Sequence, residues 1–168
     1  MLDRLRTVVD PGGARLLDLG GGSGVTTVEY GKGAREVVVL EPDARKTERG
    51  VRAHAPVTFV NAVAEAVPFE AGRFDRVVSL MSYHHFSDGE KACREAARVL
   101  ASGGWFVVYD IHRSSLPARW LSVVARHRGH SAFGFATPEE LARNLTAAGF
   151  RSVRTERFRS GSFVVGER

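Results

Sequence analysis

The sequence predicts a single α/β domain with a doubly wound, mostly parallel sheet of seven strands and an antiparallel strand near the C-terminus. Two features of the 168-residue chain predict it. Short apolar runs alternate with amphipathic stretches, which is typical of βα units around a parallel sheet. The first apolar run ends in a cluster of glycines. A chain of this length commonly forms one domain with a core of its own.

Five apolar runs in the segment 1–110 are expected to form parallel strands. They are Arg15–Leu19, Val37–Leu40, Val57–Val60, Arg76–Leu80 and Trp105–Asp110. Helices are expected over Ser23–Tyr30, Asp43–His54 and Gly89–Leu100. Pro56 follows the second of these helices and the glycine turn 102–104 follows the third, as expected for chain segments that end a helix.

The last third of the chain has a different organisation. Residues 111–136 are a long connection in which a helix could form over Leu116–His127. The next four residues, Thr-Pro-Glu-Glu, form a capping box with proline at the first helical position, which predicts a helix over Pro138–Ala148. Arg151–Phe158 and Ser162–Val165 are expected to form an antiparallel ending. The chain therefore divides into 1–110, 111–136 and 137–168.

Composition excludes several classes of protein. Hydrophobic residues make up 43% and charged residues 26%, which is ordinary globular usage and excludes a disordered chain. Cys93 is the single cysteine, so no internal disulfide can form. No apolar run approaches the roughly 20 residues that a membrane span needs, and the N-terminus lacks the apolar stretch of a signal peptide. We therefore expect a cytoplasmic protein without a membrane span.

The positive charge is concentrated at the C-terminal end. Residues 1–110 carry 14 Lys and Arg against 15 Asp and Glu, whereas residues 111–168 carry 10 Arg against 4 Glu. An anionic partner such as nucleic acid is one interpretation. The basic residues occur singly and not in runs, which favours the alternative of a general preference for arginine.

A glycine-rich loop and an acidic residue predict a ribose-bearing cofactor. Glycines 20, 22 and 24 follow the first predicted strand in a G-x-G-x-G pattern, where they allow a ligand to lie close to the backbone. The dinucleotide pattern G-x-G-x-x-G fails in either register, and no P-loop follows. Glu41 ends the second strand, at roughly the 20-residue distance from the glycines at which an acid binds ribose in doubly wound folds. Its two carboxylate oxygens suit the two hydroxyls of a ribose.

Four stretches of the chain carry a family resemblance. They are LLDLGGGSG (16–24), VVVLEPD (37–43), AEAVPFEAGRFDRVVSLMSYHHF (64–86) and REAARVLASGGWFVVYD (94–110). In this order they resemble the class I S-adenosylmethionine (SAM)-dependent methyltransferases, and within them the small-molecule group that includes the ubiquinone and menaquinone methyltransferases. The resemblance implies a Rossmann-like fold, SAM as cofactor and S-adenosylhomocysteine as product.

The resemblance also implies a set of cofactor-binding residues. The glycine loop would hold the methionine part of SAM, Glu41 the ribose hydroxyls, Pro42 and the Val63–Ala64 turn the adenine, and Leu80 would lie near the sulfonium. The residues of the loop are Asp18, Gly20, Gly21, Gly22, Ser23 and Gly24. Val63 departs from the family pattern, which has an aspartate there that binds the adenine amino group.

Catalytic residues are harder to assign from the sequence. His84 and His85 follow the fourth predicted strand at the cofactor end of the sheet, where a neutral imidazole could remove a proton from the acceptor. The alternative is that one of the pair packs or bonds the backbone. Residues 111–136 are expected to form a substrate lid, in which aromatic and polar side chains would line a pocket: His112, Arg113, Trp120, Phe133 and Phe135. The alternative is that Trp120 and the two phenylalanines bury the connecting helix. His127 and His130 could share a helix face, but Gly129 lies between them and no carboxylate partner can be assigned, so no metal site is expected.

Three functions are compatible with this sequence. The first is methyl transfer from SAM to a small, aromatic or quinone-like acceptor. The second is methylation of RNA or protein, favoured by the basic C-terminal third, although nucleic-acid binding motifs are lacking. The third is a non-catalytic SAM-binding partner subunit, favoured by Val63 and by the short segment 1–14 before the first strand, where the family usually has covering helices. The sequence leaves both a monomer and a homodimer open.

Overall fold

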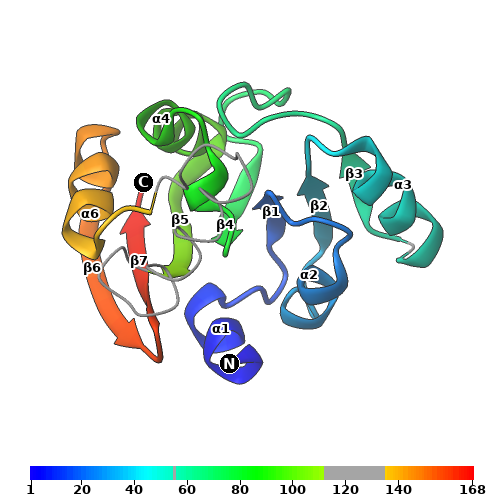
Figure 1. The fold of residues 1–168 in the computed structure, drawn as a ribbon, viewed down its shortest axis with the longest axis horizontal. Helices are drawn as coiled ribbons and strands as arrows, with labels where there is room; N and C mark the ends of the chain where they lie inside the picture. Colours follow the sequence, from blue (N-terminus) through cyan, green and yellow to red (C-terminus); the bar gives the residue numbers. More distant parts are fainter. Residues whose placement is uncertain (55, 112–134) are drawn as a thin grey trace, which may run out of the picture.

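A seven-stranded sheet forms the centre of the molecule in the computed structural model, which describes residues 1–54, 56–111 and 135–168 (Figure 1). The strands are β1 (Arg15–Leu19), β2 (Glu36–Leu40), β3 (Thr58–Val60), β4 (Phe74–Leu80), β5 (Leu100–Ile111), β6 (Arg151–Phe158) and β7 (Gly161–Glu167). The helices are α1 (Leu2–Val9), α2 (Val25–Tyr30), α3 (Ala44–Ala53), the 3₁₀ turn η1 (Tyr83–His85), α4 (Gly89–Val99) and α6 (Pro138–Ala147).

The order of the strands creates a switch point beside β1. The order of the strands in the sheet is β3-β2-β1-β4-β5-β7-β6. The first five strands in this order are parallel to one another, and β7 is antiparallel to both β5 and β6. The chain builds outward from β1 to β3 and then returns to place β4 on the other side of β1. Ligands of doubly wound sheets bind beyond the carboxyl ends of the strands at such a point.

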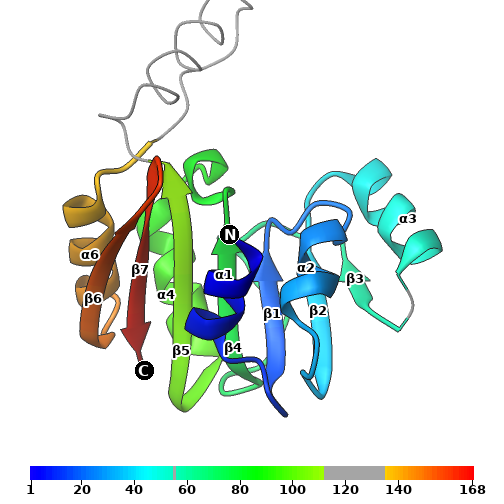
Figure 2. The same ribbon diagram turned by 90° about the horizontal axis from the view of Figure 1, so that it is seen from below.

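Helices cover both faces of the sheet and enclose two apolar cores. Figure 2 shows α1 and α2 on one face and α4 and α6 on the other. Cys93 and Leu145 pack with the second face, and Leu5 and Tyr30 with the first. All four side chains are fully buried. Helices α1, α4 and α6 each bury a stripe of apolar side chains against the strands, as expected for amphipathic helices on a sheet.

Side-chain caps fix where three of the helices begin. Asp43 accepts a hydrogen bond from the Arg45 amide before α3, and Asp88 accepts one from Lys91 before α4. Thr137 and Glu140 form the reciprocal pair of bonds predicted for the start of α6. Such caps satisfy amide groups that have no partner inside the helix.

The predicted fold class is confirmed, whereas most element boundaries shift by one or a few residues. β1 and β6 have the predicted bounds, whereas α2 begins at Val25 because Gly24 adopts a left-handed conformation with φ 76°. Leu100 was expected to end a helix but begins β5, where it pairs with Phe74. The lid prediction, including its helix and aromatic residues except Phe135, lies outside the described residues.

Helix α1 was not predicted from the sequence. Its buried residues, Leu5 and Val9, pack against the first face of the sheet, and Asp10 ends it in a left-handed conformation. Within the described residues, no helix has the length and apolar character needed to cross a bilayer.

Candidate functional site

A cleft of about 370 Å³ opens at the switch point, beyond the carboxyl ends of β1, β2 and β4. Several predicted cofactor residues lie in its wall, together with residues that the sequence analysis did not select. The predicted residues in the wall are Gly20, Glu41, Pro42, Val63, Ala64 and His85. The additional ones are Leu40, Lys46, Glu65, Met81, Ser82, Phe86 and Ser87.

The glycine loop meets the end of β4 at Gly20. Gly20 has φ 75°, and a Cβ atom placed on it would lie 2.6 Å from the Cβ of Ser82. Ser82 in turn donates a hydrogen bond from its hydroxyl to the Leu19 carbonyl at 2.7 Å. A side chain at position 20 would therefore be strained in its backbone and would collide with a fixed neighbour. This contact explains why the loop needs glycine where it borders the cleft.

Glu41 places a carboxylate in the wall of the cleft and is held there by two backbone amides. Its Oε2 accepts a hydrogen bond from the Gly22 amide at 3.0 Å, and its Oε1 accepts one from the Asp43 amide at 3.0 Å. Lys46 Nζ lies 3.7 Å from Oε1. Glu41 is only 5% exposed. Each carboxylate oxygen has two acceptor sites, so the group retains capacity for two ligand hydroxyls.

Asp18 lies beneath the glycine loop and does not line the cleft. The Thr27 hydroxyl donates to its Oδ2 at 2.5 Å, and a Cβ on Gly21 would come within 2.5 Å of the same oxygen. Among the residues that the structure describes, its buried Oδ1 has no hydrogen-bond partner. Burial raises the pKa of Asp18 to about 6, because the charged form is disfavoured away from water. Gly22, Ser23 and Gly24 belong to the loop but are likewise absent from the cleft wall.

The segment expected to flank adenine is anchored by Glu65. Glu65 Oε1 accepts hydrogen bonds from the Ser87 amide at 2.6 Å, the Ser87 hydroxyl at 2.9 Å and the Asp88 amide at 3.1 Å. Burial opposes ionisation of Glu65, but these hydrogen bonds outweigh it and lower the pKa of the carboxyl group. Val63, two residues earlier, is 44% exposed and offers an apolar surface to the cleft.

The end of β4 presents different residues to the cleft than the sequence suggested. Leu80 packs with the core on the α1 face of the sheet, and it is absent from the cleft wall. Met81 adopts φ 54°, which redirects the chain so that Met81 and Ser82 border the cleft. The left-handed backbone at Met81 therefore decides which side chains of this strand end border the cleft.

The two candidate catalytic histidines occupy different environments. His85 is exposed and lines the cleft. Partial burial and the neighbouring His84 lower the pKa of His85, so a neutral imidazole predominates there at pH 7. His84 is 6% exposed, and its Nδ1 lies 2.8 Å from Asp110 Oδ1 at the end of β5. Asp110 was not selected from the sequence, although its place at a strand end beside β4 was a signal for it.

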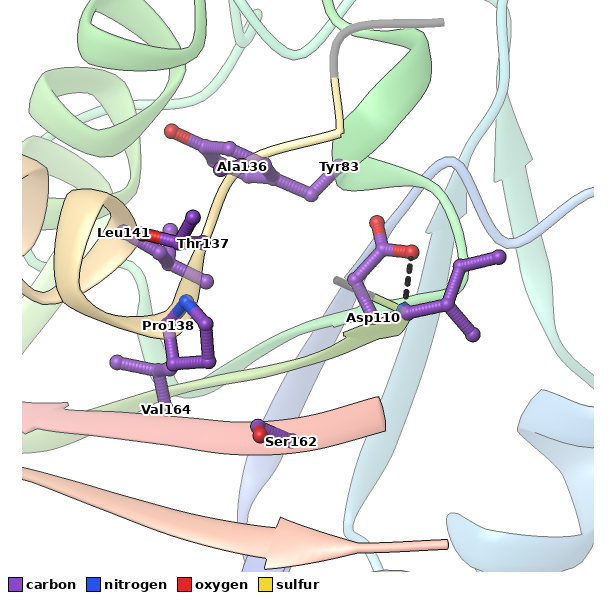
Figure 3. A pocket seen from close by; sticks show the side chains of 9 residues that line it. Tyr83, Asp110, Ala136, Thr137, Pro138, Leu141, Ser162 and Val164 are labelled. Atoms are coloured by element: carbon purple, nitrogen blue, oxygen red, sulfur yellow. Dashed lines mark hydrogen bonds between the residues drawn. The ribbon is translucent and has the colours of Figure 1, made fainter. Parts of the chain in front are cut away.

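A second, much smaller cavity lies beside Asp110 (Figure 3). Its volume is about 10 Å³, which is close to the space of one water molecule. Tyr83, Asp110 and Ser162 contribute polar groups to its lining. The Ser162 hydroxyl is buried without a hydrogen-bond partner among the described residues. Within the same part of the chain, no group of three or more His, Cys, Asp or Glu side chains could hold a metal ion.

Comparison with a family model identifies the chain. Residues 17–108 match the methyltransferase domain model, and this region contains the glycine loop, Glu41 and both histidines. The chain belongs to the methyltransferase domain family. This domain's cleft lies at the switch point of the sheet, and the resemblance stated from the four sequence stretches is confirmed.

Curated relatives include enzymes of quinol chemistry. The rice (Oryza sativa subsp. japonica) protein named 2-methyl-6-phytyl-1,4-hydroquinone methyltransferase 2, chloroplastic, is 32% identical over 148 residues, which cover 85% of this chain and 40% of the rice protein. An uncharacterized methyltransferase of Bacillus subtilis is 34% identical over 104 residues, covering 57% of this chain and 40% of that protein. The chain therefore spans about 40% of the length of these curated relatives.

Solved structures share the whole fold. A SAM-dependent methyltransferase from Mesorhizobium loti has a TM-score of 0.84 at 20% identity, covering 100% of both chains. A Haloferax volcanii structure of a methyltransferase in complex with the Trm112 methyltransferase activator has a TM-score of 0.84 at 15% identity, covering 98% of this chain and 87% of the other. At these identities the likeness establishes the fold.

Proposed function

We propose that this domain transfers a methyl group from SAM to a small hydroxylated aromatic acceptor of the phenol or hydroquinone type. The observation that carries the cofactor assignment is the Glu41 carboxylate, held in the wall of the cleft by the Gly22 and Asp43 amides. A fixed carboxylate with unused acceptor sites is suited to the vicinal hydroxyls of a ribose.

The residues of the cleft fit SAM. Gly20 lines the cleft with its backbone, Glu41 would hold the ribose, and Pro42, Val63 and Ala64 would give an apolar surface for adenine. SAM supplies a methyl group on a positively charged sulfur. Asp18 would act on the methionine part only through the glycine loop, because its side chain lies beneath that loop. Lys46 extends from α3 beside Glu41, where its ammonium group could donate to a ring nitrogen or a hydroxyl.

The acceptor class is supported by chemistry at the rim of the site and by the relatives. His84 and His85 are proposed to take part in removing a proton from the acceptor, a role that a hydroquinone hydroxyl would need near neutral pH. The rice relative is named for a hydroquinone substrate. Residues 111–136 are proposed as the substrate lid. The division of the remaining chain into 1–110 and 137–168 and the cytoplasmic location stay predictions, and both a monomer and a homodimer stay open.

Calorimetric titration of the purified domain with SAM and S-adenosylhomocysteine tests the cofactor assignment. We expect binding of both, no binding of NAD, and at least about tenfold weaker SAM binding in Glu41→Ala, since a charge-assisted hydrogen bond contributes roughly 1.5–3 kcal/mol. Glu48→Ala removes an exposed carboxylate from α3, the helix that follows Glu41, and serves as the matched control. Normal SAM binding by Glu41→Ala, or binding of NAD, contradicts the proposal.

Transfer of the methyl group is tested with radiolabelled SAM and methylhydroquinone as acceptor. The expected product is a methylated quinol that depends on both compounds. The likeness to a methyltransferase solved with an activator protein favours one alternative, a SAM-binding subunit that needs a second chain. That alternative predicts normal SAM binding, no transfer by the isolated domain, and transfer after a second chain is added.

A further inference from the structure

Met81 combines a strained backbone with a place in the wall of the cofactor cleft. It directly follows β4, adopts φ 54° and is 38% exposed. The left-handed region is disfavoured for a residue with a long side chain. Residues held in such a conformation are concentrated at functional sites, where the surrounding structure maintains them. The side chain of Met81 is therefore a candidate for a role in the cleft.

Hydrogen bonds on both sides hold Met81 in this conformation. Its backbone amide donates to the Tyr109 carbonyl of β5 at 2.8 Å. The hydroxyl of the next residue, Ser82, donates to the Leu19 carbonyl of β1 at 2.7 Å and lies 2.8 Å from the Ser79 hydroxyl of β4. The turn after β4 is thus tied to both neighbouring strands, and the direction in which the Met81 side chain leaves the backbone is fixed.

The strand ends at the cleft place Met81 and Glu41 on opposite sides of the glycine loop. The order of these strands is β2-β1-β4 (Figure 1), with Glu41 after β2, Gly20 after β1 and Met81 after β4. Glu41 is the proposed ligand of the ribose, and the loop after β1 is proposed to hold the methionine part. In SAM the sulfur joins these two parts. A cofactor held in this way would have its sulfur beside the loop, next to the side chains that follow β4.

The chemistry of the Met81 side chain suits a position beside a sulfonium. Methionine is unbranched, has three rotatable bonds and fills irregular space. Its thioether carries no charge and donates no hydrogen bond, so it does not repel a positively charged sulfur. Lys46, a cation in the wall of the cleft, lies beside Glu41 on the other side of the loop.

We propose that Met81 is a specificity-determining residue of the cofactor site, whose side chain packs against the sulfur of SAM and limits the size of the alkyl group on that sulfur. A methyl group fits beside the thioether, whereas an ethyl group collides with it. The inference rests on the proposed function, since it concerns the same cleft and the same cofactor. It concerns the methyl donor alone and is independent of the acceptor.

Methyl NMR of methionine-labelled protein tests the contact without any turnover. The chain has two methionines, Met1 and Met81, so isotopic labelling of the methionine methyl groups gives two signals, which Met81→Leu assigns. Saturation with SAM should shift the Met81 signal and leave that of Met1 unchanged. A nuclear Overhauser effect should connect the Met81 methyl group with the S-methyl group of bound SAM. If calorimetry shows SAM binding but the Met81 signal does not respond, the proposal is overturned while the cofactor assignment stands.

Calorimetry with S-adenosylethionine, the ethyl counterpart of SAM, tests the limit on size. The wild type should bind it at least about tenfold more weakly than SAM, which is the effect of one extra methylene in a closely fitting site. Met81→Ala should reduce this difference to about threefold or less, because the side chain beyond Cβ is removed. Alanine keeps a Cβ at the same backbone position, so the strain of the turn is retained. Met81→Leu has a similar volume and should keep the preference for SAM.

A matched control and the contrary outcomes complete this test. Val51→Ala shortens an exposed apolar side chain of α3 outside the wall of the cleft, and it should leave the ratio of the two affinities at the wild-type value. Equal binding of SAM and S-adenosylethionine by the wild type overturns the proposal, as does an undiminished preference for SAM in Met81→Ala. If the wild type binds neither SAM nor S-adenosylhomocysteine, the cofactor assignment fails and this inference fails with it.

Discussion

At the scale of single residues, Asp18 carries a charge that its surroundings disfavour. Asp18 is 2% exposed, Thr27 donates to its Oδ2, and its Oδ1 has no hydrogen-bond partner in the described part of the chain. Burial therefore raises the pKa of Asp18 to about 6. An unfolded chain would ionise the same group near pH 4. Between about pH 4 and pH 6, Asp18 therefore holds a proton in the folded domain that it has already lost in the unfolded chain.

This difference predicts a pH dependence of stability. Between about pH 4 and pH 6 the folded state binds more protons than the unfolded state, so the free energy of unfolding should fall as pH rises through that window. Across this window Asp18 should lower the free energy of unfolding by up to roughly 3 kcal/mol, from about two pKa units at 1.36 kcal/mol each. Urea denaturation at several pH values should show this slope in the wild type and a weaker one in Asp18→Asn. An unchanged slope in the variant would assign the dependence to other groups.

Gly20 supports a second prediction at this scale. Gly20→Ala should lower the free energy of unfolding by about 2–4 kcal/mol, because alanine disfavours φ 75° and its Cβ would collide with Ser82. Urea denaturation measures the change. Gly12→Ala is the control, since no atom lies within 4 Å of a Cβ at that position, and it should change stability by less than about 1 kcal/mol. Equal effects of the two variants would contradict the assigned contact.

The sequence was sufficient to predict some of the residues that line the cleft and not others. Gly20 and Glu41 were predictable because glycines and an acid at strand ends have a spacing that can be read along the chain. Met81 was not, because the left-handed backbone at that residue turns the chain after β4 and withdraws Leu80 from the cleft. Asp110 was missed because its role depends on contact with His84, 26 residues earlier.

At the scale of elements, the same distinction applies to helices and strands. The strand bounds of β1 and β6 were predictable because apolar or alternating runs end at turn residues. Helix α1 was not, since its eight residues bury only Leu5 and Val9 and no side-chain cap marks its start. Its stability comes from packing on the sheet, which local sequence does not report.

Glu65 joins two elements, and its removal should be costly. The carboxylate links the segment before β4 to the start of α4 through the Ser87 and Asp88 groups. Glu65→Ala should lower the free energy of unfolding by about 2–4 kcal/mol, since three partly buried hydrogen bonds to a charged group are lost together. Urea denaturation of Glu65→Ala beside Glu70→Ala, an exposed neighbour, measures the difference. Similar values for the two variants would show that the linkage contributes little.

At the scale of the whole molecule, the cleft and the basic surface lie at different parts of the sheet. The cleft is formed at β1, β2 and β4, whereas the exposed Arg151, Arg154 and Arg157 are on β6 at the sheet's edge beyond β7. The fold itself was predictable, because parallel βα units with an antiparallel ending follow from hydrophobic periodicity and turn signals. That pattern does not indicate which molecule, if any, binds the exposed arginines of β6.

This separation predicts how ligand stabilisation should respond to salt. SAM at 100 times its dissociation constant should stabilise the folded domain by about 2.7 kcal/mol, which for this size corresponds to a rise in Tm of roughly 5–10 °C. The shift should change little between low and moderate salt, because the Glu41 carboxylate is 5% exposed and buried charges are weakly screened. RNA binding to the arginines of β6 should instead fall steeply with salt. Thermal unfolding at two salt concentrations, with SAM, NAD or an RNA oligonucleotide added, measures the change in Tm that each ligand causes. A SAM shift that disappears at the higher salt would mean that the cofactor binds the exposed surface and not the cleft.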